Sequence, residues 1–271
     1  MNGGRVVTGA AGVCAVGLLA APLAWVAIAS LMPDSLVFTR GVAATGLSLD
    51  HYRALLAERG FLLAIRNSLV VAGLTTAVAL PLAATCAYAI ARLPLRGRGP
   101  LLAVLLAVSM FPQISVVAPL FLVLRELGLI NTYPGLVLPY VTFTTPLAVW
   151  LLTAFFRQLP RELEEAALVD GASRLRTLRD VVLPLAAPGL SSTAILTFLY
   201  AWNEFLFALS FTFDADRQTV PVAIALLRGR YQVPWGQVLA AAVLASLPVA
   251  LVVAAFQRRI VAGLTAGAVK G

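Results

Sequence analysis

Six uncharged stretches, each at least 23 residues long, dominate this sequence. They run over Val6–Pro33, Asn67–Ala91, Gly99–Leu124, Leu127–Phe156, Val181–Asn203 and Tyr231–Gln257. A helix needs about 20 apolar residues to cross a bilayer, and a helix satisfies all of its backbone N–H and C=O groups within one segment. The sequence therefore predicts an all-α polytopic membrane protein in a lipid bilayer. We expect six transmembrane helices in a single domain, residues 1–271.

The first stretch has some features of a signal peptide. Arg5 precedes it, and Ala27-Ile28-Ala29 is typical of a cleavage site. The apolar part of a signal peptide is only about 7–15 residues long, whereas this stretch holds 28 uncharged residues. We therefore expect an uncleaved first transmembrane helix.

Six spans place both termini on the same side of the membrane. If that side is the cytoplasm, the inner segments hold twelve Lys and Arg residues and the outer segments hold eight. This is the bias that the positive-inside rule requires. The short turn Arg92–Arg98, with three Arg residues and no acid, favours the same orientation. We expect both termini in the cytoplasm.

The remaining composition excludes several classes of function. The net charge of +8 does not indicate nucleic-acid binding, because no basic patch with interleaved aromatic residues is present. Cys14 and Cys86 lie in apolar stretches without metal-binding spacing, so we expect packing roles and no metal site. The single histidine, His51, has no catalytic constellation around it in the sequence, and no nucleotide-binding G-x-x-x-x-G-K-[ST] motif is found. A membrane enzyme is therefore disfavoured.

Proline interrupts the third stretch. Phe111-Pro112-Gln113 and Pro119 each favour a kink or a break, because proline removes a helical hydrogen bond. In a membrane such a break is tolerated where the backbone faces protein or a water-filled cavity. We expect an irregular helix here that lines a cavity, although ordinary kinks in a bundle would give the same pattern.

A polar island, residues 157–184, separates the fourth and fifth stretches. Ten of its first 24 residues are charged, so it cannot lie in hydrocarbon. Asp170-Gly171 predicts the end of a first helix, since glycine adopts the left-handed conformation readily. Ser173 predicts the cap of a second helix. We expect that second helix to place Leu175, Leu178 and Val182 on one face, and the whole island to form a helical hairpin on the cytoplasmic surface.

The island resembles the EAA loop of ABC importer permeases. Glu165-Ala166-Ala167, three residues, Gly171, nine residues and Val181-Val182-Leu183-Pro184 follow the pattern E-A-A-x3-G-x9-I-x-L-P, with Val181 in place of Ile. The resemblance implies the type I ABC importer permease fold and a coupling helix that docks on an ATPase. The residues it implies for ATPase coupling are Glu165, Ala166, Ala167, Asp170, Gly171, Leu183 and Pro184.

The resemblance extends from about Leu49 to the C-terminus and is to the MalG-type (CUT1-like) carbohydrate permeases. Asn67-Ser68-Leu69, Ala201–Phe205 and the tail Gln257–Gly271 carry it. The tail and Phe111–Ser115 look most similar to SugB-type permeases of trehalose importers. The resemblance implies a bacterial inner-membrane subunit that works with a second homologous permease, two ATPase subunits and an extracytoplasmic sugar-binding protein. It also implies that ATP and Mg are bound by the ATPase, with no cofactor in this chain, and that the cytoplasmic tail, residues 257–271, contacts the ATPases.

Glu204 is the one acid embedded in an apolar context. An ionisable residue at membrane depth is a functional candidate by default, but a buried structural pair is an equally good interpretation. The other candidates for the substrate pathway are Asn203, Gln113, Ser115 and Thr144. Adjacent helical residues point about 100° apart, so Asn203 and Glu204 are not expected to face the same lumen.

The leading hypothesis is thus a non-catalytic permease subunit of an ATP-driven importer, carrying trehalose or a maltose-like oligosaccharide. An ABC importer permease for another polar solute is the nearest alternative. A secondary transporter or channel is the alternative from a different class. It would need paired broken helices or several intramembrane acids, and only Glu204 qualifies.

Overall fold

The structure is a computed structural model that describes residues 3–37, 46–57, 59–227 and 233–268. The described residues are mostly helical and contain no strand, as the sequence predicts. They form two compact units, residues 1–62 with 223–248 and residues 63–222 with 249–271. The prediction of one permease domain stays a prediction.

Three helices in the described residues are long and apolar enough to cross a membrane. They are α3 (Arg59–Arg92), α6 (Tyr133–Gln158) and α13 (Trp235–Ala268). Two bent helix pairs bring the number to five if each pair is one span. The remaining predicted span corresponds to α1 (Gly3–Ala29), whose described apolar part is Cys14–Ala29. The predicted tail, residues 257–271, lies outside the residues whose side chains the structure describes.

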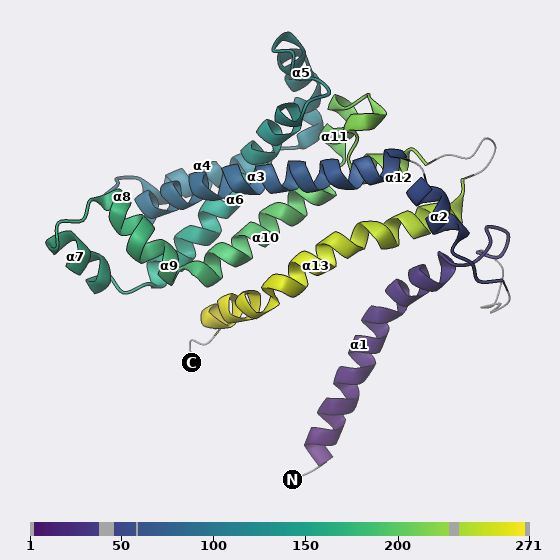
Figure 1. Cartoon of the computed structure of the whole chain (residues 1–271). Helices are drawn as coiled ribbons and strands as arrows, with labels where there is room; N and C mark the ends of the chain where they lie inside the picture. Colours follow the sequence, from purple (N-terminus) through teal and green to yellow (C-terminus); the bar gives the residue numbers. More distant parts are fainter. Residues whose placement is uncertain (1–2, 38–45, 58, 228–232, 269–271) are drawn as a thin grey trace. The chain divides into compact units, whose positions relative to one another are not determined.

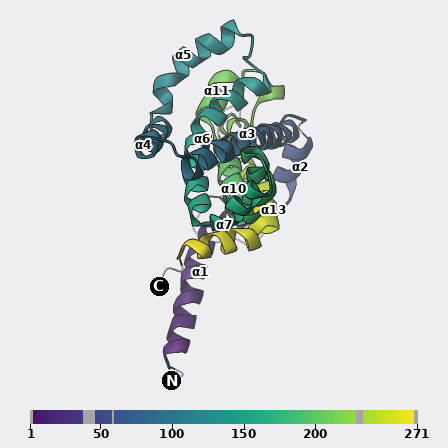
Figure 2. The same ribbon diagram turned by 90° about the vertical axis from the view of Figure 1, so that its left-hand side faces the viewer.

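The third predicted span is broken into α4 (Arg98–Ser109) and α5 (Gln113–Glu126), which meet at 82°. Figure 2 shows α4 and α5 as two sides of an open corner. The break falls at Pro112, which has extended backbone angles and no N–H to donate. The predicted irregularity of the third span is confirmed.

The fifth predicted span is also shorter than its uncharged stretch. The segment Arg174–Leu185 meets α10 (Ala187–Asn203) at 85°, so Val181–Leu185 belongs to the polar island's second helix. Pro188 lies in the first turn of α10, where its missing N–H costs nothing. The helix ends at Asn203 because Glu204 is extended, and the short helix α11 (Leu206–Phe211) follows.

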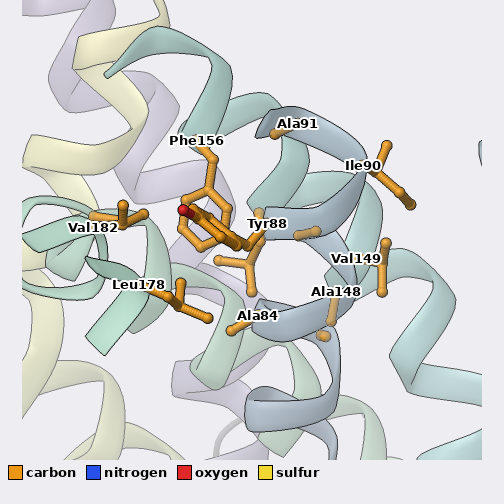
Figure 3. Packing of buried hydrophobic residues seen from close by; sticks show 13 residues of the cluster. Ala84, Tyr88, Ile90, Ala91, Ala148, Val149, Phe156, Leu178 and Val182 are labelled. Atoms are coloured by element: carbon orange, nitrogen blue, oxygen red, sulfur yellow. The ribbon is translucent and has the colours of Figure 1, made fainter. Parts of the chain in front are cut away.

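The buried core of the larger unit joins the island to the membrane helices. Ala84, Tyr88 and Ala91 of α3 pack with Phe156 of α6 and with Leu178 and Val182 from the island; Figure 3 shows the Tyr88 ring among these side chains. The opposite side of α3 is apolar and exposed at Leu74, Val78 and Leu82. This exposed stripe at four-residue spacing is what a lipid-facing helix surface requires.

Helices α6 and α10 approach closely at Gly189. A Cβ atom at this position would lie 2.4 Å from Cγ of Phe155 on α6. Only glycine therefore fits between the two helices without moving the aromatic ring.

In the smaller unit, α2 (Asp50–Ala57) is bonded to the end of α1 and its following turn. The Tyr52 and Ser30 hydroxyls lie 2.6 Å apart, and His51 Nε2 lies 3.0 Å from the Met32 carbonyl oxygen. His51 also packs against Gly236 at the start of α13. The lone histidine is thus a packing and hydrogen-bonding residue.

Candidate functional site

The polar island folds as the predicted helical hairpin. Its first helix, α7 (Glu162–Val169), is terminated by the turn Asp170-Gly171, in which Gly171 has a φ of +84°. The Gly171 N–H donates to the Leu168 carbonyl and the Ala172 N–H to the Ala167 carbonyl, which is the Schellman arrangement of a helix end. Ser173 then caps α8 (Arg174–Thr177) by accepting from the Arg176 N–H at 3.3 Å.

The predicted coupling residues lie mostly on the outside of this hairpin. Glu165, Ala166, Asp170, Gly171 and Pro184 are exposed, while Ala167 and Leu183 are half-buried. The nearby apolar side chains Val169 and Leu175 are 87% and 69% exposed. Small residues beside exposed apolar and acidic ones form a surface that a partner protein can approach closely.

The predicted face of the second helix is partly wrong. Leu178 and Val182 are buried as expected, but Leu175 points outward. The segment Leu178–Val182 is a π-helix, in which hydrogen bonds join residue i to i+5. The 3.6-residue pattern used for the prediction does not apply within this wider turn.

Sequence reasoning missed an ion pair beneath the hairpin. Nε of Arg92, at the C-terminal end of α3, lies 2.7 Å from Oε1 of Glu164, and their side chains are 4% and 7% exposed. Arg92 also donates from Nη2 to the Leu159 carbonyl at 2.8 Å. Glu164 lies one helical turn before the half-buried Leu168 on the inner face of α7.

A second region, the α10–α11 cleft, lies where these two helices meet. It is a cavity of about 540 Å³ lined by Gln113, Leu199, Tyr200, Asn203, Glu204, Phe205 and Leu206. Three of the predicted pathway residues thus line one cleft, together with Tyr200. The Gln113 amide donates to the Tyr200 hydroxyl across the cleft. Asn203 and Glu204 both line it because the helix ends between them, contrary to the expectation for adjacent helical residues.

The Glu204 carboxylate has a structural task within this cleft. Oε1 accepts from the Phe207 N–H at 2.8 Å and Oε2 from the Ala208 N–H at 3.1 Å. These are two of the amide groups that α11 leaves without helical partners, and the helix N-terminus also favours a negative charge. The Tyr140 hydroxyl neighbours the same carboxylate. Glu204 is 7% exposed, so it lines the cleft while capping α11.

The other two pathway candidates lie elsewhere. Ser115 is an exposed residue in the first turn of α5. Thr144 is buried on α6, where its hydroxyl donates to the Tyr140 carbonyl at 2.8 Å. It lines a separate cavity of about 130 Å³ between α6 and α10. The structure does not bring Ser115 or Thr144 to the α10–α11 cleft.

A buried amide forms another hub near the N-terminal end of α3. Asn67 Nδ2 donates to the carbonyls of Asp216 and Gln218, both at 2.9 Å, and its Oδ1 accepts from the Tyr133 hydroxyl at 2.7 Å. The neighbouring Ser68 accepts from the Val220 N–H at 2.8 Å. Asn67 therefore ties the segment between α11 and α12 (Val220–Ala225) to α3 and α6.

Comparison with known proteins places this fold in a family. Residues 79–265 match the family described as binding-protein-dependent transport system inner membrane component. The trehalose transport system permease protein SugB of Mycobacterium tuberculosis is 45% identical over 94% of each chain. The trehalose/maltose transport system permease protein MalG of Thermococcus litoralis is 43% identical over 92% of this chain and 91% of the relative.

Among solved structures, the fold is similar to a chain of a bacterial ABC transporter involved in the import of the acidic polysaccharide alginate. The TM-score is 0.77 at 21% identity, with 95% of this chain and 96% of that chain covered. The sequence relatives and the family match extend over most of the chain, and members of this family are non-catalytic membrane components. The chain thus belongs to the MalG-type inner-membrane permeases of binding-protein-dependent ABC importers, and it is a transport subunit rather than an enzyme.

Proposed function

We propose that this chain is the permease subunit of an ATP-driven sugar importer and forms half of its translocation pathway. The relatives at 43–45% identity are named for trehalose and maltose transport. We assign the chain a disaccharide such as trehalose, or a maltose-like oligosaccharide. A second homologous permease supplies the other half of the pathway, and an extracytoplasmic sugar-binding protein delivers the solute. A solved alginate transporter of similar fold (TM-score 0.67) is described in complex with a pentasaccharide-bound periplasmic protein, which supports this arrangement.

The α7–α8 hairpin is the observation that carries the coupling part of the proposal. It is fixed by a Schellman turn at Gly171 and by the Ser173 cap, so it holds its shape without a partner. Its outer surface presents Glu165, Ala166 and Asp170. In Figure 1, α7 and α8 lie at the left end of the larger unit, beside the C-terminal end of α3. A rigid, exposed hairpin on a membrane helix bundle is suited to follow a conformational change of a bound ATPase.

The energy comes from two ATPase subunits that bind ATP and Mg, while this chain holds no cofactor. The excess of Arg on the hairpin side favours a cytoplasmic position for the hairpin and for both termini. The C-terminal tail, residues 257–271, is a second proposed ATPase contact.

The α10–α11 cleft is the proposed sugar route on this subunit. Its amide and hydroxyl groups from Gln113, Tyr200 and Asn203 suit sugar hydroxyls, and Phe205 offers an aromatic face. We retain Ser115 and Thr144 as pathway candidates at other depths. A volume of about 540 Å³ falls within the usual range for small-molecule sites.

The test is reconstitution of the complete complex in lipid vesicles, with sugar uptake and ATP hydrolysis measured together. We expect a disaccharide with its binding protein to stimulate ATP hydrolysis in the wild type. Gly171→Asp keeps the subunit inserted but is expected to abolish stimulated hydrolysis and uptake, because it adds bulk and charge at the turn. Normal uptake by Gly171→Asp would rule out the coupling role of the hairpin.

Another polar solute is the second candidate. Relatives at 38% and 39% identity are named for transport of sulfoquinovosyl glycerol and diacetylchitobiose. A panel of glucosides, amino sugars and sulfonated sugars in the same assay decides between the candidates. Stimulation by a sugar other than a disaccharide of glucose would replace trehalose in the proposal and leave the coupling part intact.

A further inference from the structure

The ion pair between Arg92 and Glu164 joins two parts of the molecule with different tasks. Arg92 is the last residue of α3, a continuous helix of 34 residues, and Glu164 is the third residue of α7. The same guanidinium also holds the Leu159 carbonyl, just after the end of α6. One side chain therefore connects a membrane helix, the end of a second membrane helix and the hairpin.

The surroundings of the pair are dry and tightly packed. Tyr88 lies one turn before Arg92 on α3, and its hydroxyl faces Glu164 and Arg174. The Tyr88 ring packs in the buried cluster with Phe156, Leu178 and Val182 (Figure 3). Burial removes competition from water, so the attraction between these two charges is stronger than it would be at the surface. The attraction in an exposed pair such as Arg176–Asp180, with side chains 73% and 53% exposed, is much weaker.

A buried ion pair contributes little net stability, because removing both charges from water is unfavourable. Apolar side chains of similar volume usually give equal or greater stability, whereas removal of only one charge costs about 3–5 kcal/mol. Stability alone does not account for a charged pair at this junction. A link between α3 and α7 accounts for it, because a packed apolar contact can slide, whereas sliding here would separate two buried charges.

We propose that Arg92 is a positioning residue that locks α7 to α3, so that a displacement of the hairpin moves α3 with it. The inference rests on the proposed coupling function. Arg92 touches neither ATP nor solute, and it acts through Glu164 and the Leu159 carbonyl. Without the Arg92–Glu164 pair, the hairpin still binds and regulates an ATPase. A displacement of the hairpin is then transmitted only in part to α3.

The experiment uses the double variant Arg92→Met/Glu164→Leu in the complete complex in vesicles. Both charges are removed together, so no unpaired charge is left buried. We expect normal assembly and continued ATP hydrolysis, with solute imported per ATP reduced about tenfold, within the range typical of allosteric coupling. The control is Asp50→Asn/Arg53→Gln, which removes an exposed ion pair with side chains 73% and 77% exposed. We expect the control to import the wild-type amount of solute per ATP hydrolysed.

A wild-type ratio of uptake to hydrolysis in the double variant would overturn the inference. If the double variant does not assemble, Arg92→Lys decides. Lysine keeps the charge for Glu164 but lacks the fork that also reaches Leu159. A reduced ratio in the assembled Arg92→Lys complex supports the lock, and an unchanged ratio overturns it. Gly171→Asp separates the two proposals. If Gly171→Asp abolishes uptake while the double variant keeps the wild-type ratio of uptake to hydrolysis, only the inference about Arg92 is refuted. If Gly171→Asp shows normal uptake, the proposed coupling role of the hairpin is refuted.

Discussion

Glu204→Gln tests whether the buried acid in the α10–α11 cleft caps α11 or contacts the transported solute. The glutamine side chain keeps the size and one carbonyl oxygen, but it replaces the second oxygen with an NH2 group. That group would face the Phe207 or Ala208 N–H, donor against donor, at a site only 7% exposed. The negative charge at the helix N-terminus is lost at the same time.

The size of the effect follows from these two bonds. A hydrogen bond to a charged group contributes about 1.5–3 kcal/mol, and the helix dipole adds about 0.3–1 kcal/mol. Loss of one bond and of the charge therefore predicts about 2–4 kcal/mol. Helix α11 has only six residues, and it carries Phe207 and Phe211, which are fully buried. Loosening of α11 would also disturb the contacts of Phe211 with Phe121 on α5.

The assay measures the unfolding midpoint of the purified complex in detergent and, separately, solute uptake in vesicles. We expect Glu204→Gln to assemble, to unfold at lower temperature and to import more slowly. The control for the stability measurement is Asn203→Ala in the same cleft. Asn203 is exposed and its amide donates to the Leu199 carbonyl of its own helix, so its removal should cost no more than about 0.5 kcal/mol. Unchanged stability together with lost uptake in Glu204→Gln would refute the capping role and favour direct solute contact.

Two further changes probe the helix packing and the Asn67 hub. Gly189→Ala places a Cβ 2.4 Å from the Phe155 ring and should destabilise the subunit by about 1–3 kcal/mol. The control is Gly73→Ala, where a Cβ would meet no described atom within 4 Å. Equal unfolding midpoints for the two variants would contradict the close approach of α6 and α10. Asn67→Asp keeps the shape but removes both donors to the carbonyls of residues 216 and 218. We expect limited proteolysis to cut the segment between α11 and α12 faster in this variant, and an unchanged rate would show that the hub does not hold the segment.

Local chemistry explains which parts of the structure could be predicted from the sequence. Gly171 was predictable because a left-handed helix end selects glycine whatever surrounds it. The break at Pro112 was predictable because proline has no N–H to donate. In both cases one residue determines its own backbone conformation, so distant contacts are not needed.

The burial of Glu164 and the partner of Glu204 could not be predicted in the same way. Three carboxylates occupy the first turn of α7, and the helix dipole favours each of them equally. Only the position of Arg92, 72 residues earlier in the chain, selects Glu164 for burial. Glu204 has the same sequence signature whether it lines a pathway or caps the next helix. The position of Glu204 just before a short apolar segment is the one sequence feature that indicates a helix cap.

The contrast between Glu164 and Glu165 shows how one short helix can serve two partners. Adjacent residues on a helix point about 100° apart, so the two carboxylates cannot face the same side. Glu164 is buried against Arg92, and Glu165 is exposed beside the small residues of the hairpin. In the proposed coupling, a force applied at Glu165 would reach Arg92 through less than one turn of α7. The proposed coupling then depends on two neighbouring acids as well as on the rest of the EAA segment, with Glu165 directed outward and Glu164 paired with Arg92 of α3.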